Sequence, residues 1–120
     1  MKYYSFENKG NYIEMKLTGS YKRERFITYP KILFEECQKQ KIFVALLDAS
    51  DVTDAKVTDA DKITAVLEMA SRFGYILKLA IIWPEKNFSK DTETVARNRG
   101  VSILITADKQ TALNWLLHDI

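Results

Sequence analysis

Apolar and polar positions in the middle of the chain follow two different patterns, one after the other. Residues 42–47 are an unbroken apolar run, which is typical of a strand buried on both faces of a sheet. Asp48 comes directly after this run, so we expect the strand to end there. From Thr58 onward the apolar residues recur at helical spacing: Ile63, Val66, Leu67, Ala70 and Phe73. The centre of the chain therefore predicts a strand, an acidic loop and a helix.

The first part of the chain predicts an antiparallel hairpin. Residues 2–7 have a weak strand pattern, and apolar and polar side chains alternate over residues 12–18, as in a half-buried strand. Residues 8–11 contain Gly10 and form the turn signal between them. We expect Gly19 and Ser20 to end the second strand.

The rest of the chain alternates between helix and strand patterns. A helix is expected from the N-cap Thr28 to about Gln40, with Pro30 in its first turn and residues 24–27 as a lead-in turn. Gly74 should stop the central helix. The later expected elements are a strand at 77–83, a helix at 89–100, a strand at 101–105 and a helix capped by Asp108.

This order of elements predicts an α/β fold in a single domain spanning residues 1–120. The expected order is β-β-α-β-α-β-α-β-α, which gives one five-stranded, mostly parallel sheet with an N-terminal antiparallel hairpin. A chain of 120 residues is close to the common size of one domain.

Composition excludes several classes of protein. No apolar run approaches the roughly 20 residues of a membrane helix, so we do not expect an integral membrane protein. The first residues lack the apolar segment of a secretory signal, which favours a cytoplasmic location. A formal charge of +2 is too small to indicate nucleic-acid binding. The single Cys37 rules out an internal disulfide and is expected to be a buried thiol.

Charge is unevenly placed along the chain. Residues 1–41 hold nine Lys and Arg against five Asp and Glu, whereas the remainder holds nine against eleven. The basic excess is sharpest at Lys22, Arg23 and Arg25. The acidic cluster consists of Asp48, Asp51, Asp54, Asp59 and Asp61. Solvated loops explain both clusters, and the alternative is that they face each other at one edge of the sheet.

Histidine and cysteine, which catalytic pairs and zinc sites commonly use, occur only once each. The only histidine, His118, lies near the C-terminus on a helix expected to pack outside the sheet. Zinc-type ligand sets are therefore absent, and the spacing of the acidic cluster matches no EF-hand loop. The four glycines are isolated, so no phosphate-binding loop is indicated. We predict no enzyme, no metal and no cofactor.

Aromatic residues gather where ligands bind in open α/β sheets. Trp83 ends a predicted strand, and Tyr21, Phe26 and Tyr29 follow the second strand. Such aromatics commonly close the end of a core. The functional alternative is an apolar pocket for a small hydrophobic or lipid-like molecule.

Four segments in order resemble the STAS domain (sulfate transporter and anti-sigma-factor antagonist), and more closely its SpoIIAA-like branch. The matching segments are residues 12–19, 46–52, 93–101 and 111–116. The resemblance covers essentially the whole chain. It implies a regulatory or protein-interaction domain rather than a catalyst.

The resemblance also points to a regulatory position. In anti-sigma-factor antagonists, a serine after an Asp at the start of the helix following the central strand is phosphorylated by a partner kinase. A phosphate at a helix N-terminus would change an interface strongly. Here Asp59 matches that Asp, but Ala60 stands where the serine should be. Thr58 or Ser50 could substitute for it.

The sequence predicts one interaction surface, one alternative site for a ligand and one strand that is available for pairing. We expect a protein partner to bind Ser50, Asp51, Thr58, Asp59, Ala60 and Asp61. The alternative is a small apolar or lipid-like ligand, as carried by lipid-binding relatives of the same fold group, bound near Tyr21, Lys22, Arg23, Arg25 and Trp83. The strand at residues 2–7 could also pair with a second copy to form a homodimer.

Overall fold

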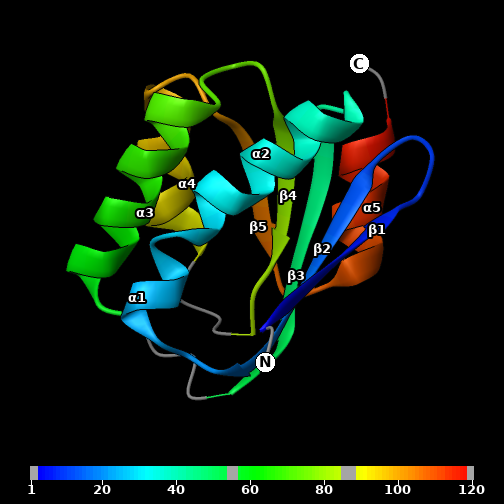
Figure 1. Ribbon diagram of the computed structural model, residues 1–120. Coiled ribbons are helices and arrows are strands. Elements are labelled where there is room, and N and C mark those ends of the chain that lie inside the picture. The colour runs from blue at the N-terminus through cyan, green and yellow to red at the C-terminus, as the bar shows by residue number, and fades with distance from the viewer. Residues whose placement is uncertain (1–2, 54–56, 85–88, 119–120) are drawn as a thin grey trace.

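Five strands form one sheet in which the order in space equals the order in the chain (Figure 1). The computed structural model describes residues 3–53, 57–84 and 89–118. Strand β1 (Tyr4–Asn8) pairs antiparallel with β2 (Ile13–Ser20). Strands β3 (Val44–Thr53), β4 (Lys78–Ile82) and β5 (Ser102–Thr106) continue the sheet in parallel. The predicted α/β fold with an N-terminal hairpin is therefore confirmed.

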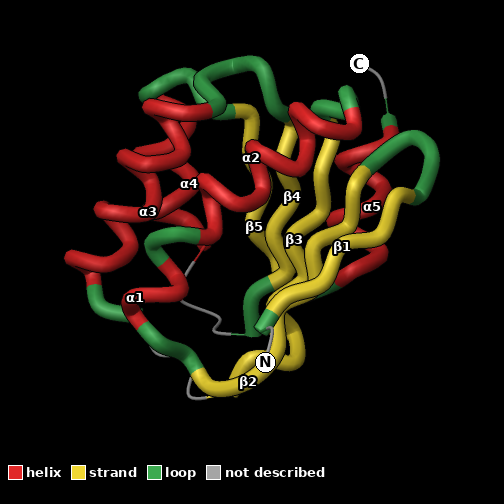
Figure 2. The backbone as a smooth tube through the Cα atoms, viewed as in Figure 1, coloured by secondary structure: helices red, strands yellow, loops and turns green. Residues whose placement is uncertain are grey.

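The helices divide unequally between the two faces of the sheet. They are α1 (Arg23–Phe26), α2 (Tyr29–Gln40), α3 (Asp59–Arg72), α4 (Ser89–Asn98) and α5 (Lys109–Leu117). Because the parallel strands follow one another in sequence, successive right-handed crossovers place their helices on the same face. Figures 1 and 2 show α1 to α4 on that face, while α5 lies on the other.

Each face has its own apolar core. The larger core lies between the sheet and the first four helices, and its fully buried side chains include Leu17, Leu33 and Phe73. The smaller core lies under α5 and contains Leu46, Ala80, Ile82, Ala112 and Leu116. Cys37 is buried in the larger core, as expected, and burial raises the pKa of its thiol to about 12.

Several helix ends agree with the sequence-based expectations. The Thr58 hydroxyl accepts a hydrogen bond from the Asp61 backbone N–H at 3.1 Å, which caps α3. The Asp108 carboxylate accepts one from the Thr111 N–H at 2.9 Å, which caps α5. Pro30 lies in the first turn of α2, and Gly74 follows the end of α3 with φ +52°.

The expected lead-in turn before α2 is instead a helix of its own, α1. Thr28 is the N-cap residue of α2, but its hydroxyl makes no cap bond to that helix. It donates at 2.8 Å to the carbonyl of Arg25, which belongs to α1. The side chain thus ties the two helices together.

The expectation that β3 ends at Asp48 is wrong. The strand continues to Thr53, because β2 extends further than expected and pairs with it: Thr18, Gly19 and Ser20 lie opposite residues 51–53. The register shifts between Lys16 and Thr18, where β3 carries one additional residue.

Gly19 does not end β2 but lies within it. Its φ is +85°, and an added Cβ would lie 3.0 Å from the ring of Tyr3. Glycine is needed here for both its backbone conformation and this close approach.

Candidate functional site

One carboxylate joins the first turn of α3 to the segment that follows β2. The Tyr21 hydroxyl donates to Asp61 Oδ2 at 2.7 Å, and Arg23 Nε donates to Asp61 Oδ1 at 2.7 Å. The expectation that basic and acidic clusters face each other is therefore confirmed for Arg23 and Asp61. We call Tyr21, Arg23 and Asp61 the latch.

Local structure places Asp61 for this role. The Thr58 cap fixes the start of α3, and Asp61 shares a helical face with the buried Ala65 and Met69. Only 5% of Asp61 is exposed. Ala65 and Met69, its neighbours on that face, have no side-chain groups that could donate a hydrogen bond to its carboxylate. An ionised carboxylate in this position needs donors, which Tyr21 and Arg23 supply.

The contacts within the latch shift the pKa values of the Asp61 carboxyl and the Tyr21 hydroxyl in opposite directions. The Tyr21 hydrogen bond, assisted by Arg23, holds the pKa of Asp61 below its usual value against the opposing effect of burial. Burial and the nearby carboxylate both raise the pKa of Tyr21. Asp61 is therefore ionised and Tyr21 protonated at neutral pH.

A row of aromatic rings leads from the latch into the molecule. The ring centroids of Tyr21 and Phe26 are 5.4 Å apart, and those of Phe26 and Trp83 are 5.5 Å apart, both in edge-to-face arrangements. Trp83 follows β4 and is 98% buried. These rings close one end of the larger core, as one of the two sequence-based interpretations expected.

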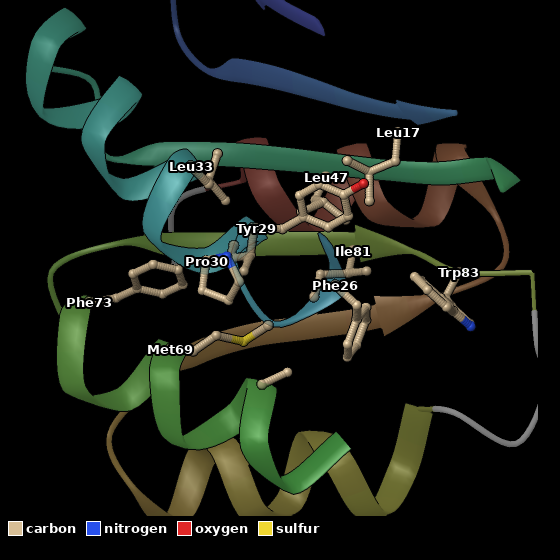
Figure 3. A pocket seen from close by; sticks show the side chains of 12 residues that line it. Leu17, Phe26, Tyr29, Pro30, Leu33, Leu47, Met69, Phe73, Ile81 and Trp83 are labelled. Carbon is tan, nitrogen blue, oxygen red and sulfur yellow. The ribbon is translucent and has the colours of Figure 1, made fainter. Parts of the chain in front are cut away.

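An apolar cavity lies beside this aromatic row. Phe26, Tyr29 and Leu33 enclose it from the α1–α2 side (Figure 3). Met69 of α3 and Phe73, which directly follows that helix, enclose it from the other side, and the strands supply its floor. Its volume is about 20 Å³, close to the space that one water molecule requires. In this conformation the cavity holds no larger ligand.

The other residues of the predicted ligand site, Tyr21, Lys22, Arg23 and Arg25, do not line this cavity. Tyr21 and Lys22 line a second, smaller hollow together with Trp83. Arg25 points elsewhere: it donates at 2.6 Å to the carbonyl of Ser20, and its guanidinium carbon lies 3.5 Å from the centre of the Tyr3 ring. Arg25 therefore fixes the backbone rather than lining the cavity.

Ser50 and Asp51 belong to a different cluster, on the α5 side of the sheet. The Ser50 hydroxyl donates to the buried Asp48 at 2.6 Å, and Asp48 also lies 3.8 Å from the Lys109 ammonium on α5. Asp51 pairs with Lys16 at 3.2 Å. The sheet thus separates Ser50 and Asp51 from Thr58, Asp59, Ala60 and Asp61, so the predicted partner-binding residues do not form one surface. Asp54 of the acidic cluster lies outside the described residues.

The outer face of α3 is the feature that the sequence-based site missed. Ile63 and Leu67 belong to the apolar series, yet they are 45% and 43% exposed, because Ala65, Val66 and Met69 face the core instead. A groove of about 140 Å³ runs beside them between α3 and α4. It is lined by Asp59, Lys62, Ile63, Val66, Asp91, Thr92 and Val95.

Among residues 3–53, 57–84 and 89–118, no three His, Cys, Asp or Glu side chains are grouped so that they could hold a metal ion. In the same ranges no helix is both long enough and apolar enough to cross a membrane. His118 is exposed at the end of α5.

Comparisons with known proteins identify the fold. No protein-family model matches the sequence, and no curated protein matches it. Among solved structures, the chain is similar to an uncharacterized protein of the DUF3478 family, with a SpoIIAA-like fold, from Shewanella loihica PV-4. The TM-score is 0.58 at 21% sequence identity, covering 94% of this chain and 91% of that chain. The chain therefore has the SpoIIAA-like fold that the sequence motifs indicated.

Proposed function

We propose that this chain is a non-catalytic regulatory domain that binds a protein partner through the outer face of α3. The observation that carries the proposal is the exposure of Ile63 and Leu67 one turn apart, beside the groove between α3 and α4. Neighbouring apolar residues on a helix surface, rimmed by polar groups, are typical of interaction sites.

Charge around the groove indicates what kind of partner fits. The side chain of Asp59 is fully exposed at the start of α3, and Asp91 is exposed in the first turn of α4. Among the described residues that line the groove, Lys62 is the only cation, and it lies 3.9 Å from Asp59. A partner segment with an apolar side chain flanked by Lys or Arg would complement this surface.

The latch gives this surface a fixed shape. Asp61 holds the first turn of α3 to Arg23 and Tyr21, so Asp59 and Ile63 are presented from a helix whose start is anchored. A preorganised surface loses less conformational entropy when it binds. In this proposal Asp61 supports partner binding indirectly, whereas Asp59 contacts the partner.

The test compares two leucines of equal exposure on opposite sides of the molecule. Leu67 on α3 and Leu117 on α5 are each 43% exposed. We expect Leu67→Asp to reduce capture of the partner from lysate of the native host at least tenfold, because a hot-spot contact is typically worth about 2 kcal/mol or more and tenfold corresponds to about 1.4 kcal/mol. Leu117→Asp should leave capture unchanged. The readout is quantitative mass spectrometry of proteins retained by each variant.

Loss of the same captured protein with both leucine variants would contradict the assignment to α3. Retention of all captured proteins by Leu67→Asp would contradict it as well. Equal melting temperatures of the two variants are required, since both substitutions place a charge at a half-exposed position.

A second candidate function, binding of a small apolar or lipid-like ligand, is favoured by the cavity beside Trp83. Its lining is almost wholly apolar, and α1 with Phe26 forms part of its wall. A ligand larger than water would need this wall to move, and α1 also carries Arg23 of the latch. Native mass spectrometry of protein purified from its own host tests this function. An added mass of a few hundred daltons, released by organic solvent, is the expected result, and a bare subunit mass contradicts it.

A further inference from the structure

The two edges of the sheet differ in whether other parts of the chain bond to their outward backbone groups. Strand β1 forms one edge and β5 the other. An edge strand has backbone N–H and C=O groups with no neighbouring strand, and these groups can pair with another chain.

Side chains of α4 occupy the β5 edge. The Arg97 guanidinium donates to the carbonyl of Ile103 at 3.0 and 2.8 Å. The Glu93 carboxylate accepts from the Ile105 N–H at 2.6 Å. Both kinds of edge group on β5 are therefore already bonded within the chain, and this blocks the addition of another strand.

The β1 edge is open. The Tyr3 carbonyl accepts from the Thr18 N–H and the Lys9 N–H donates to the Tyr12 carbonyl, both at 2.9 Å, so the odd-numbered residues of this strand face β2. Antiparallel ladders alternate, and the N–H and C=O groups of Tyr4, Phe6 and Asn8 consequently point outward. Among the described residues, no hydrogen bond from another element reaches these backbone groups.

The sequence of β1 also lacks the usual protection of an edge strand. Natural edges carry proline, lysine or a bulge. Residues 4–8 read Tyr-Ser-Phe-Glu-Asn, without proline or lysine, and their pairing with β2 is regular. Glu7 is the only charge, and Lys9 already pairs with it at 2.8 Å.

We propose that β1 pairs antiparallel with β1 of a second copy of this chain, about a two-fold axis at Phe6. Phe6 then lies opposite Phe6 of the second copy, and Tyr4 lies opposite its Asn8. The outward N–H and C=O groups of these residues form the inter-chain ladder, and the two sheets become one continuous sheet of ten strands. The surface involved lies away from the outer face of α3, so this inference does not depend on the proposed function.

Side chains support this register over its neighbours. Tyr4 and Phe6 are half-buried and 5.6 Å apart in an edge-to-face contact, so the two-fold axis extends an existing aromatic row across the interface. On the other face Ser5 lies opposite Glu7 of the second copy. Moving the axis to Glu7 would place two like charges opposite each other, and moving it to Ser5 would shorten the ladder.

A charged residue substituted for Ser5 should change the stability of the subunit and the stability of the dimer in opposite directions, which gives a test of the proposal. Within the chain Ser5 lies opposite Lys16, whereas across the proposed interface it lies opposite Glu7. Ser5→Glu is thus favourable in the subunit and repulsive in the dimer, at two symmetric contacts. Ser5→Lys has the reverse effects.

Sedimentation velocity over a range of protein concentrations measures the dimer dissociation constant. We expect a concentration-dependent dimer for the unmodified chain. Ser5→Glu should raise the dissociation constant about 2- to 30-fold, because like charges directly opposite cost about 0.2–1 kcal/mol each. Ser5→Lys should lower it by a similar factor, while its melting temperature falls slightly.

The matched control is Ser102→Glu, the same substitution at an exposed position on the blocked β5 edge. It should leave the dissociation constant unchanged. A monomer at every concentration would overturn the proposal, as would equal effects of Ser5→Glu and Ser5→Lys. Amide hydrogen exchange provides a second readout: the backbone amides of Tyr4, Phe6 and Asn8 should become more protected as protein concentration rises. If other amides became protected on dimerisation while these three did not, the proposal would be overturned.

Discussion

At the scale of single residues, Asp61 illustrates where sequence reasoning about the site succeeded and failed. Its acidic character and its position near a helix cap were read correctly from Thr58 and the following turn. The burial of Asp61 was not predicted, because an Asp two residues after Asp59 is readily interpreted as part of the same solvent-exposed acidic cluster. The available signal was its spacing of four and eight residues from Ala65 and Met69, which places it on the core face. Its two donors come from residues 38 and 40 positions away, which no local pattern reveals.

The latch predicts a pH dependence of stability. The folded-state pKa of Asp61 is lowered, so its contribution is complete above about pH 5 and is lost as pH falls through the folded pKa. Asp61→Asn lacks this contribution. We therefore expect the variant to melt below the unmodified protein near pH 7, and the difference in melting temperature to shrink as the solution is acidified.

Asp59→Asn is the control for this prediction, because the Asp59 side chain is fully exposed and the Lys62 ammonium lies 3.9 Å from its carboxylate. It should change the melting temperature little at any pH. A difference between Asp61→Asn and the unmodified protein that stays constant down to about pH 2 would show that ionisation of Asp61 is not its source.

At the scale of elements, the sequence predicted type and order well and boundaries less well. Buried parallel strands such as β4 are short apolar runs bounded by proline or glycine, so local composition identifies them. Strand β3 was predicted too short because its second half, from Ala49 to Thr53, pairs only with β2 and carries polar residues. That extension depends on the length of another strand, which is a tertiary effect.

The bonds between α4 and the β5 edge predict a measurable local stability. Glu93 has an only slightly exposed side chain that accepts the Ile105 N–H and also lies 3.5 Å from Arg97. Glu93→Ala leaves that N–H without an acceptor and should cost about 1–2 kcal/mol of unfolding free energy. Faster amide exchange at Ile105 would accompany it.

A suitable comparison is Glu68→Ala on α3. Its carboxylate pairs with Arg72 one turn away on a half-exposed surface, so removal should cost about 0.5 kcal/mol or less. Chemical denaturation measures both variants. Equal losses would contradict a special role for Glu93 at the edge of the sheet.

At the scale of the whole molecule, the fold was predictable because helix and strand patterns alternate through most of the chain. Its interaction surfaces were not predictable in the same way. The sheet separates Ser50 from Thr58 although both follow one apolar run, and exposure of Leu67 depends on how α3 rotates against its neighbours. The position of a residue on one side of the sheet and the exposure of a helix residue both depend on how several elements pack together, and no single segment of sequence determines them.

The sequential strand order also bears on how the chain folds as it leaves the ribosome. Each new strand from β2 to β5 adds to an edge that has already been synthesised, so none has to insert between two earlier neighbours. The last helix, α5, arrives after all the strands, and until then Leu46, Ala80 and Ile82 face water. Completion of the nascent sheet therefore precedes the sealing of its second face, and in that interval the sheet exposes an apolar face that α5 later covers.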